Sequence, residues 1–505
     1  MDQPPALGAP RLRARRLRLQ TQDEAIVLMR SACHLCKSEG LSARARVLVR
    51  CGGREVIATL YQTDGDWLSV DEIGLSEAAW RRLELNEDDP VAVGHAPAVE
   101  SLADVRRRAF GDRLDKRAFY AIISDIVAGR YVDIHLATFL TACSTLPLDI
   151  NETSYLTEAM VESGERLTWA ADIVSDKHCV GGLPGNRTTP IVVAIAASCG
   201  LIMPKTSSRA ITSPSGTADA METLAPVQLD IAAMRRVVEA EGACIAWGGG
   251  VKLSPADDVL IRMERALDID PEGQLIASVL SKKLAAGASH VVFDLPVGPT
   301  AKVRTEQAAH SLAQRMRILA QSFRLEVNIL FTDGSQPVGR GIGPALEARD
   351  VLAVLDNSES APTDLRDRSL AIAAALLELT GVAGRGEGFA LAKQVLGDGQ
   401  ARSKFERIRE AQGGVRAPPV APLKQPLNAR RSGIVTHMNN RKLSRLAKLA
   451  GAPDDKSAGI EVMVKLGDAV SSGQPLALIH AETPGELDYA LGYALTNLDM
   501  VEIES

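Results

Sequence analysis

Two loops in the middle of the chain combine glycines, hydroxyl groups and cationic side chains, which is the chemistry of an anion site. They cover residues 175–189 and 205–219. Glycines let backbone N–H groups approach a ligand closely, and a helix that begins after such a loop adds the positive end of its dipole. The loops begin about 30 residues apart, as in one strand–helix–strand unit. We therefore predict that together they form a phosphate-binding cradle.

The cradle has a plain alternative, because serine, threonine and glycine also make ordinary turns between strands and helices. One such loop alone would favour that interpretation, whereas two favour phosphate binding. Neither loop has the Gly-Lys-Ser/Thr of a P-loop or the Gly-x-Gly-x-x-Gly of a dinucleotide site. The positive charge would come from four residues: Lys177, Arg187, Lys205 and Arg209. His178 lies among them, where a packing role and a functional role are both open.

A third loop follows a strand predicted at residues 290–295. Ligands of open α/β sheets bind beyond the carboxyl ends of the strands. We therefore expect three loops to meet at one cleft: residues 176–189, 206–217 and 296–302. Three cations would make this cleft positive: Lys177, Arg209 and Lys302.

A predicted helix after Asp270 carries further polar side chains. Asp270 precedes a proline and a glutamate, as at many helix N-termini, so it could cap the helix or act in catalysis. Ser278 and Lys282 share one face of this helix because they are four residues apart. They could bind the polar edge of a planar ligand, or Lys282 could be a solvated surface charge. For Asp257 and Asp258, in the preceding helix, a capping role is sufficient.

The composition is that of an ordinary globular protein and argues against several functions. The chain has 505 residues, of which 46% are apolar and 24% charged, so about three domains are expected. Aromatic residues make up 4% and the net charge is −6, so we expect no nucleic-acid partner. We also expect no membrane span, no secretory signal and a cytoplasmic location, whose reducing conditions the seven cysteines fit. The Cys-x-x-Cys at residues 33–36 has no second pair, so we expect no metal site.

Four segments would position the candidate residues. They are a β-rich N-terminal module at 1–95, a helical domain at 96–170 to which residues 258–288 return, a mixed-sheet α/β domain at 171–257 and 289–425, and a small C-terminal α+β module at 432–505. In the α/β domain, short apolar runs between glycines and prolines predict the strands of a mainly parallel sheet: residues 191–199, 243–247, 290–295 and 327–331.

Local patterns predict further elements in the other segments. Alternating residues predict strands near 11–19, 45–49 and 55–60, and the arginines of the first would form a solvated face. Helical spacing predicts helices at 118–128 and 135–143, and clustered prolines predict a linker at 411–433. Residues 462–476 resemble half of a barrel-sandwich hammerhead without the lysine of a lipoyl or biotinyl carrier, so the C-terminal module is expected to be structural.

Four stretches occur in an order that matches a known family. They are Asp176-Lys177-His178-x-x-Gly181-Gly182, Ser207-Ser208-Arg209-Ala210-Ile211-x-x-x-x-Gly216-Thr217-x-Asp219-x-x-Glu222, the helix at 275–283 and the strand ending in Val297-Gly298. With them the chain resembles the thymidine/pyrimidine-nucleoside phosphorylase family over roughly residues 97–505. The first module is similar to the extra domain of a longer branch, which includes archaeal AMP phosphorylases and bacterial type 2 thymidine phosphorylases.

The resemblance implies a helical domain hinged to the α/β domain, in a homodimer or larger assembly. It implies phosphorolysis, in which phosphate attacks C1′ of a nucleoside and releases the free base and a pentose 1-phosphate. The partners would be a nucleoside or nucleotide and inorganic phosphate as co-substrate, with no other cofactor.

The resemblance also implies roles for individual residues. Asp270 would donate a proton to the leaving base, with His178 as the other candidate acid. Ser278 and Lys282 would contact the base. Phosphate would be held by Lys177, Thr189, Ser207 and Thr217. In the longer branch a nucleotide site would be lined by Gly182, Ser208, Arg209, Ala210, Ile211, Thr212, Ser213, Thr217, Ser278 and Lys302.

Departures from the family pattern leave the substrate open. Cys179 stands where shorter members have a phosphate-binding serine, and only Arg262 and Arg265 are candidates for the arginine that holds the pyrimidine. We predict a thymidine phosphorylase-type pentosyltransferase of pyrimidine salvage, with a nucleoside 5′-monophosphate (AMP) phosphorylase as the alternative. The alternative needs a second anion site, for which three cations are candidates: Arg187, Arg209 and Lys302.

Two rival functions come from other classes. One is a non-catalytic, nucleotide-binding regulator on the same scaffold. The other is a dinucleotide-dependent oxidoreductase, which the missing Gly-x-Gly-x-x-Gly pattern disfavours.

Overall fold

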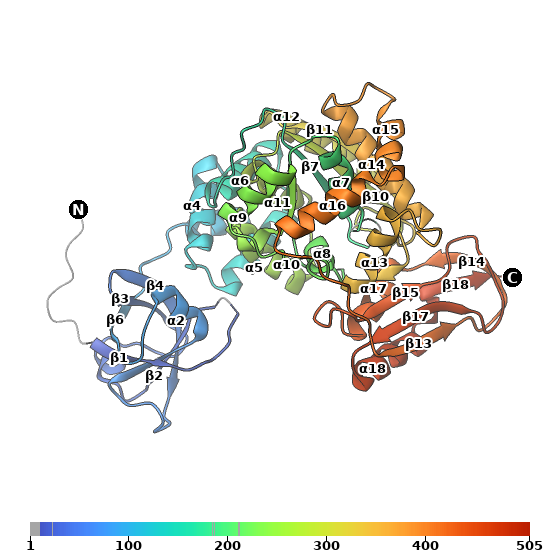
Figure 1. Cartoon of the computed structure of the whole chain (residues 1–505). Helices are drawn as coiled ribbons and strands as arrows, with labels where there is room; N and C mark the ends of the chain where they lie inside the picture. The colour runs from blue at the N-terminus through green and yellow to red at the C-terminus, as the bar shows by residue number, and fades with distance from the viewer. Residues whose placement is uncertain (1–10, 23, 184, 186, 211–212, 505) are drawn as a thin grey trace. The chain divides into compact units, whose positions relative to one another are not determined.

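The computed structural model describes residues 11–22, 24–183, 185, 187–210 and 213–504 (Figure 1). The chain divides into two compact units, residues 1–142 and 143–505, and each is considered by itself. Two predicted site residues, Ile211 and Thr212, lie outside the described residues. Within the described ranges, no helix is both long enough and apolar enough to cross a membrane.

The first unit begins with a closed β-barrel in the strand order β1-β5-β2-β4-β3-β6. Its elements are β1 (Arg11–Arg16), β2 (Ile26–Arg30), α1 (His34–Ser38), β3 (Arg46–Cys51), β4 (Arg54–Thr63), β5 (Glu72–Leu75), α2 (Glu77–Leu83) and β6 (Pro90–His95). The strands predicted near 11–19, 45–49 and 55–60 are therefore confirmed. Leu12 and Ala14 are buried in the barrel, whereas Arg13, Arg15 and Arg16 form ion pairs on its outside, as the alternation of a strand requires.

Helices follow the barrel: α3 (Leu102–Ala109), α4 (Lys116–Val127), α5 (Asp133–Thr145) and α6 (Ile150–Glu162). The predicted helices at 118–128 and 135–143 are confirmed as α4 and α5. Asp115 caps α4, since its carboxylate accepts a hydrogen bond from the N–H of Ala118 at 2.9 Å. The second unit begins in the last turn of α5, and a capping box of Asp149 and Glu152 starts α6.

The second unit is built on parallel strands. In one sheet β10 (His290–Val297) lies between β11 (Glu326–Asp333) and β7 (Ser175–Cys179), and in another β8 (Met203–Ser207) pairs with β9 (Ala243–Trp247). A parallel bridge from Val174 to Ile202 connects the two sheets. The mainly parallel α/β fold is therefore confirmed. Because these neighbours all run parallel, their carboxyl ends share one edge, where ligands bind in such folds.

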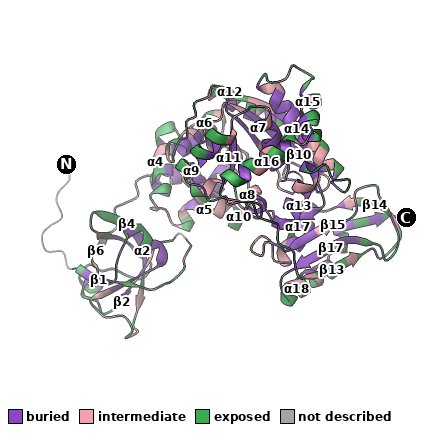
Figure 2. Ribbon diagram, viewed as in Figure 1, coloured by how far each residue is buried: buried purple, intermediate pink, exposed green. Residues whose placement is uncertain are grey.

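One predicted strand is wrong, because residues 188–198 form the helix α7 (Thr188–Ser198). Every residue from Thr188 to Ala197 is buried, so the helix has no polar face. A helix that is apolar all round shows no helical periodicity, and a short run of this kind cannot be told from a buried strand. Figure 2 shows α7 in purple within the α/β part of the unit, where it packs against α14 (Thr363–Leu379) and α16 (Gln400–Ala411).

The remaining helices of the α/β part surround these strands. They are α8 (Thr217–Glu222), α9 (Ile231–Glu241), α10 (Pro255–Leu267), α11 (Glu272–Ala285), α12 (Glu306–Ser322), α13 (Pro344–Leu355) and α15 (Gly388–Gly397). Helix α11 packs against α6, so two segments far apart in the sequence form one helical layer.

The C-terminal part contains two antiparallel sheets and two helices. One sheet has the order β12-β15-β17-β13 and the other β16-β14-β18. Their elements are β12 (Gly341–Ile342), β13 (Leu423–Asn428), β14 (Gly433–Met438), α17 (Asn440–Leu449), β15 (Gly459–Val462), β16 (Ala469–Val470), β17 (Pro475–Ala481), α18 (Pro484–Thr496) and β18 (Val501–Glu504). The linker predicted at 411–433 is wrong over β13, an edge strand where Pro426 is tolerated.

Candidate active site

The three predicted loops meet beyond the carboxyl ends of the parallel strands. A Cβ atom built on Gly181 would lie 3.4 Å from the Pro296 ring, so the first and third loops are in contact. A Cβ atom on Gly182 would lie 3.8 Å from Cβ of Ser213, which brings the second loop to the first. The predicted convergence is therefore confirmed by these close approaches.

The first loop holds its lysine inside the fold. Lys177, in the middle of β7, is fully buried, and its ammonium group donates to the hydroxyls of Thr188 and Thr189 at 2.5 and 3.2 Å. Burial lowers the pKa of Lys177. The ammonium group thus lies at the N-terminus of α7, so a cation and a helix dipole act at one place. Lys177 orders the threonines that would hold phosphate and is not itself open to solvent.

The neighbouring Cys179 is a neutral group. Burial, and then the carboxylate of Asp294, raise the pKa of its thiol. Cys179 can therefore replace the hydroxyl of a serine only with the weaker hydrogen bonds of a thiol.

The second loop supplies one hydroxyl that is without a partner. The Oγ atom of Ser207, at the end of β8, is buried and makes no hydrogen bond to any described residue. A buried polar group without a partner is costly, and a bound ligand oxygen would satisfy it. Gly216 in the same loop has to be glycine, because a side chain there would collide with the backbone of Ser208. Thr217 begins α8 directly after it.

Arg209 is committed to carboxylates and is not an open anion ligand. Its guanidinium group donates to Glu222 at 2.7 and 2.8 Å and to Asp219 at 3.1 Å, and lies 4.9 Å from the ring centre of Trp247. Asp219 also accepts from the backbone N–H groups of Ala210 and Gly216 at 2.6 and 3.0 Å. These bonds hold the loop in shape, so Arg209 is a paired cation in this structure, and its role toward an anion in the cleft stays a prediction.

The proposed acid is paired with the cation of the third loop. Nζ of Lys302 lies 2.7 Å from Oδ2 of Asp270, and their side chains are 36% and 41% exposed. Asp270 is not a helix cap, because Pro271 occupies the N-cap position of α11 and no side chain bonds there. An accessible carboxyl group without a capping task fits the catalytic alternative better.

His178 is a poor acid in this environment. Burial, followed by the positive charges of Lys283 and Lys205, lowers the pKa of His178 well below its ordinary value. Its ring packs edge-to-face on Phe293, with 6.3 Å between the ring centres. A neutral imidazole has no extra proton to donate near neutral pH, so the geometry favours Asp270 over His178.

The residues expected to contact the base lie on α11. Lys282 forms an ion pair with Asp257 of α10, so Asp257 is not merely a cap and Lys282 is not a solvated charge. Although burial alone would lower the pKa of Lys282, Asp257 raises it above its ordinary value. Ser278 lies one turn earlier on α11 and is partly buried. The two residues share one face of α11, a buried carboxylate anchors Lys282, and their contact with the base stays a prediction.

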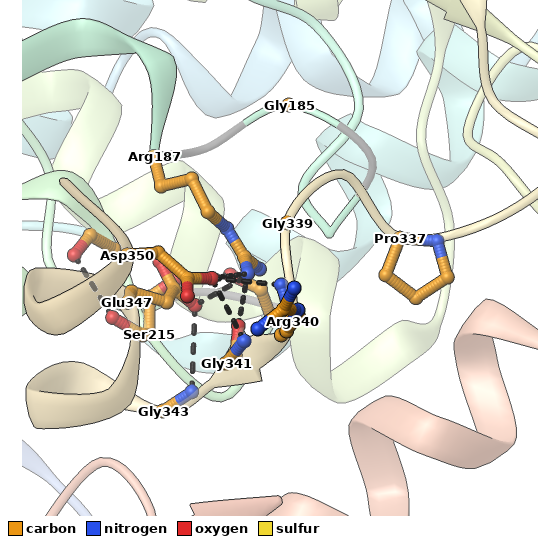
Figure 3. A network of polar contacts seen from close by, with 12 residues as sticks. Gly185, Arg187, Ser215, Pro337, Gly339, Arg340, Gly341, Gly343, Glu347 and Asp350 are labelled. Atoms are coloured by element: carbon orange, nitrogen blue, oxygen red, sulfur yellow. Dashed lines mark hydrogen bonds and ion pairs between the residues drawn. The ribbon is translucent and has the colours of Figure 1, made fainter. Parts of the chain in front are cut away.

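Two predicted cations hold the scaffold together. Lys205 lies 3.3 Å from the buried carboxylate of Asp176, which also binds Lys283 at 2.7 Å. Arg187 is completely buried and pairs with Asp350 at 3.3 Å and Glu347 at 3.7 Å (Figure 3).

Arg187 also donates to the carbonyl group of Gly341. It therefore ties the first loop to the chain before α13 and cannot serve as the second anion site.

Sequence reasoning missed one partly buried acid, Glu264, beside the site. Burial, then Asp257 and Asp270, raise the pKa of Glu264 to about 8. Its Oε1 atom is buried and makes no hydrogen bond to a described residue. Glu264 lies two helical turns after Asp257 on the same face of α10, but helical spacing alone does not reveal which acidic residue is desolvated.

Three protein-family profiles match the chain over most of its length. They describe a helical bundle domain of a glycosyl transferase family at residues 102–164, the a/b domain of that family at 171–402, and a pyrimidine nucleoside phosphorylase C-terminal domain at 434–500. The fold and the site together thus define a glycosyl-transferring enzyme.

Relatives give the same assignment in more detail, and a solved structure shares the fold. A protein of Chelativorans sp. (strain BNC1) is 63% identical over 98% of both chains, and one of Tolumonas auensis is 59% identical over 98% of both. Each is named "Putative thymidine phosphorylase". The anthranilate phosphoribosyltransferase of Thermus thermophilus is 21% identical and covers 61% of this chain and 99% of its own, with a TM-score of 0.50. That likeness shows the fold alone.

The chain belongs to the thymidine/pyrimidine-nucleoside phosphorylase family. It is therefore a pentosyltransferase of the nucleoside phosphorylase type, and the family implies a nucleoside-type substrate together with phosphate.

Proposed function

We propose that this enzyme cleaves the N-glycosidic bond of thymidine with phosphate, giving thymine and 2-deoxyribose 1-phosphate in pyrimidine salvage. The observation that carries the proposal is the accessible pair of Asp270 and Lys302. It presents a carboxyl group that can protonate a leaving base next to a cation that can hold an anionic substrate group. The names of the relatives support thymidine as the nucleoside.

The reaction assigns one task to each side of the cleft. A phosphate oxygen forms a bond to C1′ while the bond from C1′ to the base nitrogen breaks. Positive charge grows on the sugar, where the phosphate dianion stabilises it, and negative charge grows on the base. Thr189 and Ser207 hold the phosphate, Lys177 orders the first turn of α7, and Asp270 supplies the proton that leaves with the base.

The ion pair of Asp270 and Lys302 is open to exchange when the substrate arrives. A substrate group that binds Lys302 can replace Asp270 as the partner of this cation and leave the carboxyl group free to face the base. An ion pair with this exposure is worth at most about 1 kcal/mol, so substrate binding can break it.

A second candidate is the phosphorolysis of a nucleoside 5′-monophosphate, giving free base and ribose 1,5-bisphosphate. It is favoured by a cavity that opens on the far side of the second loop and is lined by Arg265 and Lys448. The three cations first considered for an extra phosphate are paired with carboxylates: Arg187, Arg209 and Lys302. Arg187 and Arg209 are held by their carboxylates, so an additional anion site has to use Lys302 or other residues.

Base release from thymidine, uridine, AMP and CMP, measured with and without phosphate, tests both candidates. Phosphate-dependent release of thymine at the highest kcat/KM supports the first. Preferred release of adenine or cytosine from the monophosphates supports the second. No release from any of the four substrates would refute both.

A further inference from the structure

A cavity of about 330 Å³ opens in the second unit between the second loop, the end of α10 and the segment around α17. It is lined by four cations and two carboxylates: Arg209, Arg265, Lys448, Lys456, Asp219 and Asp454. The volume lies at the lower end of the range for small-molecule sites, roughly 300 Å³ and above. The cavity thus suits a small anion and not a polymer.

Two cations that line the cavity, Arg265 and Lys448, have no carboxylate partner, and a third, Arg445, acts on Lys448 from outside the lining. Arg265 lies in the last turn of α10, and Arg445 and Lys448 lie one turn apart on α17. In the part of the chain that the structure describes, none of the three forms an ion pair. The two groups are far apart in sequence, and only folding brings them together.

The charges of this cluster act on each other. Burial, then Arg265 and Arg445, lower the pKa of Lys448, and no carboxylate opposes them. Like charges that are partly removed from water repel strongly, because the local dielectric is lower than that of water. Such an arrangement weakens the fold unless an anion binds to it.

The opposite wall is different, because its cations are already neutralised. Lys456 lies 3.5 Å from Asp219 and 3.3 Å from Glu222, and Arg209 pairs with the same two carboxylates. Asp454 is exposed and, within the described ranges, reaches no cation of the cavity at ion-pair distance. The positive charge available to a ligand is therefore concentrated on α10 and α17.

We infer that Arg265 and Lys448, with Arg445 beside them, form a second anion site next to the second loop, which binds a phosphate dianion, free or esterified to a sugar, in addition to the one expected at Ser207. A guanidinium group offers two parallel N–H donors that match phosphate oxygens, and two such groups with an ammonium exceed the charge of one carboxylate. The inference deepens the second candidate function, which needs an additional anion site, but it concerns binding and does not require turnover.

Phosphate binding to the full-length protein tests the site directly by calorimetry. Wild type should bind two phosphate ions per chain, and Arg265→Gln/Lys448→Gln should keep one and bind the other roughly 10- to 100-fold more weakly. The double variant Arg430→Gln/Arg431→Gln removes two exposed charges from the same C-terminal part and should behave as wild type. If all three proteins bind phosphate equally, the proposed second site is refuted.

Two further measurements keep the result interpretable. Tighter binding of ribose 5-phosphate than of phosphate at the second site supports a sugar ester as the ligand, and the reverse order supports free phosphate. Without ligand, Arg265→Gln/Lys448→Gln should melt at the same or a higher temperature than wild type, since repulsion is removed. Saturating phosphate should raise the melting temperature of wild type by more than that of the double variant. A variant that melts lower in both conditions would assign these cations to the fold and refute the inference.

Discussion

Lys302 and Asp270 are joined by an ion pair, with 2.7 Å between Nζ and Oδ2, although they belong to different loops. The pair links the third loop of the cradle to the start of α11, which carries the residues expected to contact the base. Because both side chains are partly exposed, the pair is weak and open to a ligand. It therefore offers a direct test of how substrate binding prepares the acid.

Asp270→Asn should lower kcat by about 100- to 10,000-fold, the usual contribution of a general acid, while phosphate binding is kept. Asp268→Asn is a matched control, because Asp268 is exposed two residues earlier and adopts a left-handed conformation that asparagine tolerates. Steady-state kinetics and phosphate titration of both variants make the comparison. An unchanged kcat in Asp270→Asn would remove Asp270 from the mechanism.

His178→Gln should not change the shape of the pH profile of kcat/KM between about pH 6 and 9: no ionisation should disappear or shift. The reason is that burial and two lysines hold the pKa of His178 well below this range, so the ring stays neutral throughout. The height of the profile can fall, since the ring packs on Phe293. Disappearance of one limb of the profile in the variant would instead identify His178 as the titrating acid.

Glu264→Gln should remove the part of the pH dependence of the free energy of unfolding that comes from this carboxyl group. Burial, with Asp257 and Asp270, raises the pKa of Glu264 to about 8 in the folded state, above an unfolded value of about 4.3. The stability that the folded protein gains from protonated Glu264 is complete below the unfolded-state pKa of this residue and is lost as the pH rises to 8.

The free energy of unfolding of wild type should therefore fall, relative to Glu264→Gln, by at most about 1.4 kcal/mol per pH unit over this window. Urea unfolding at pH 5 and pH 8 measures the difference. Glu239→Gln, an exposed change on α9, should follow wild type at both pH values. Parallel behaviour of all three proteins would contradict the desolvation of Glu264.

Arg187→Met should destabilise the second unit by about 3–5 kcal/mol, the usual cost of leaving a buried charge without its partner. Glu347 has a pKa raised to about 7 by burial, and Arg187 holds it down. Without Arg187, Glu347 should be protonated more readily, so the defect should be smaller at pH 6 than at pH 9. Arg340→Met, an exposed change beside it, should cost at most about 0.5 kcal/mol. Chemical unfolding that gives equal losses for the two variants would refute the role of Arg187.

Much of the architecture could be predicted from the sequence, because the signals are local. Period-two alternation revealed β1, and helical spacing revealed α4 and α5. The exceptions share a cause. Helix α7 is buried on all sides, and strand β13 contains a proline, so neither shows the pattern of its own class.

The sequence by itself determined which chemical groups are present at the cleft and in which order. Glycines that permit close backbone contact, and hydroxyls beside a helix start, are properties of short segments, so the anion cradle and the face of Ser278 and Lys282 were visible before folding. The convergence of the three loops also followed, because the carboxyl ends of parallel strands share one edge.

Only the tertiary structure decided which charges are free to act. Arg209, Arg187 and Lys302 look alike in the sequence, yet each finds its carboxylates differently: Arg209 within its own loop and α8, and Arg187 and Lys302 in other segments. Pairing changes what a cation can bind. The same long-range packing leaves Arg265 and Lys448 together without a carboxylate. Burial and charge pairing depend on neighbours in space, so they cannot be read from spacing along the chain.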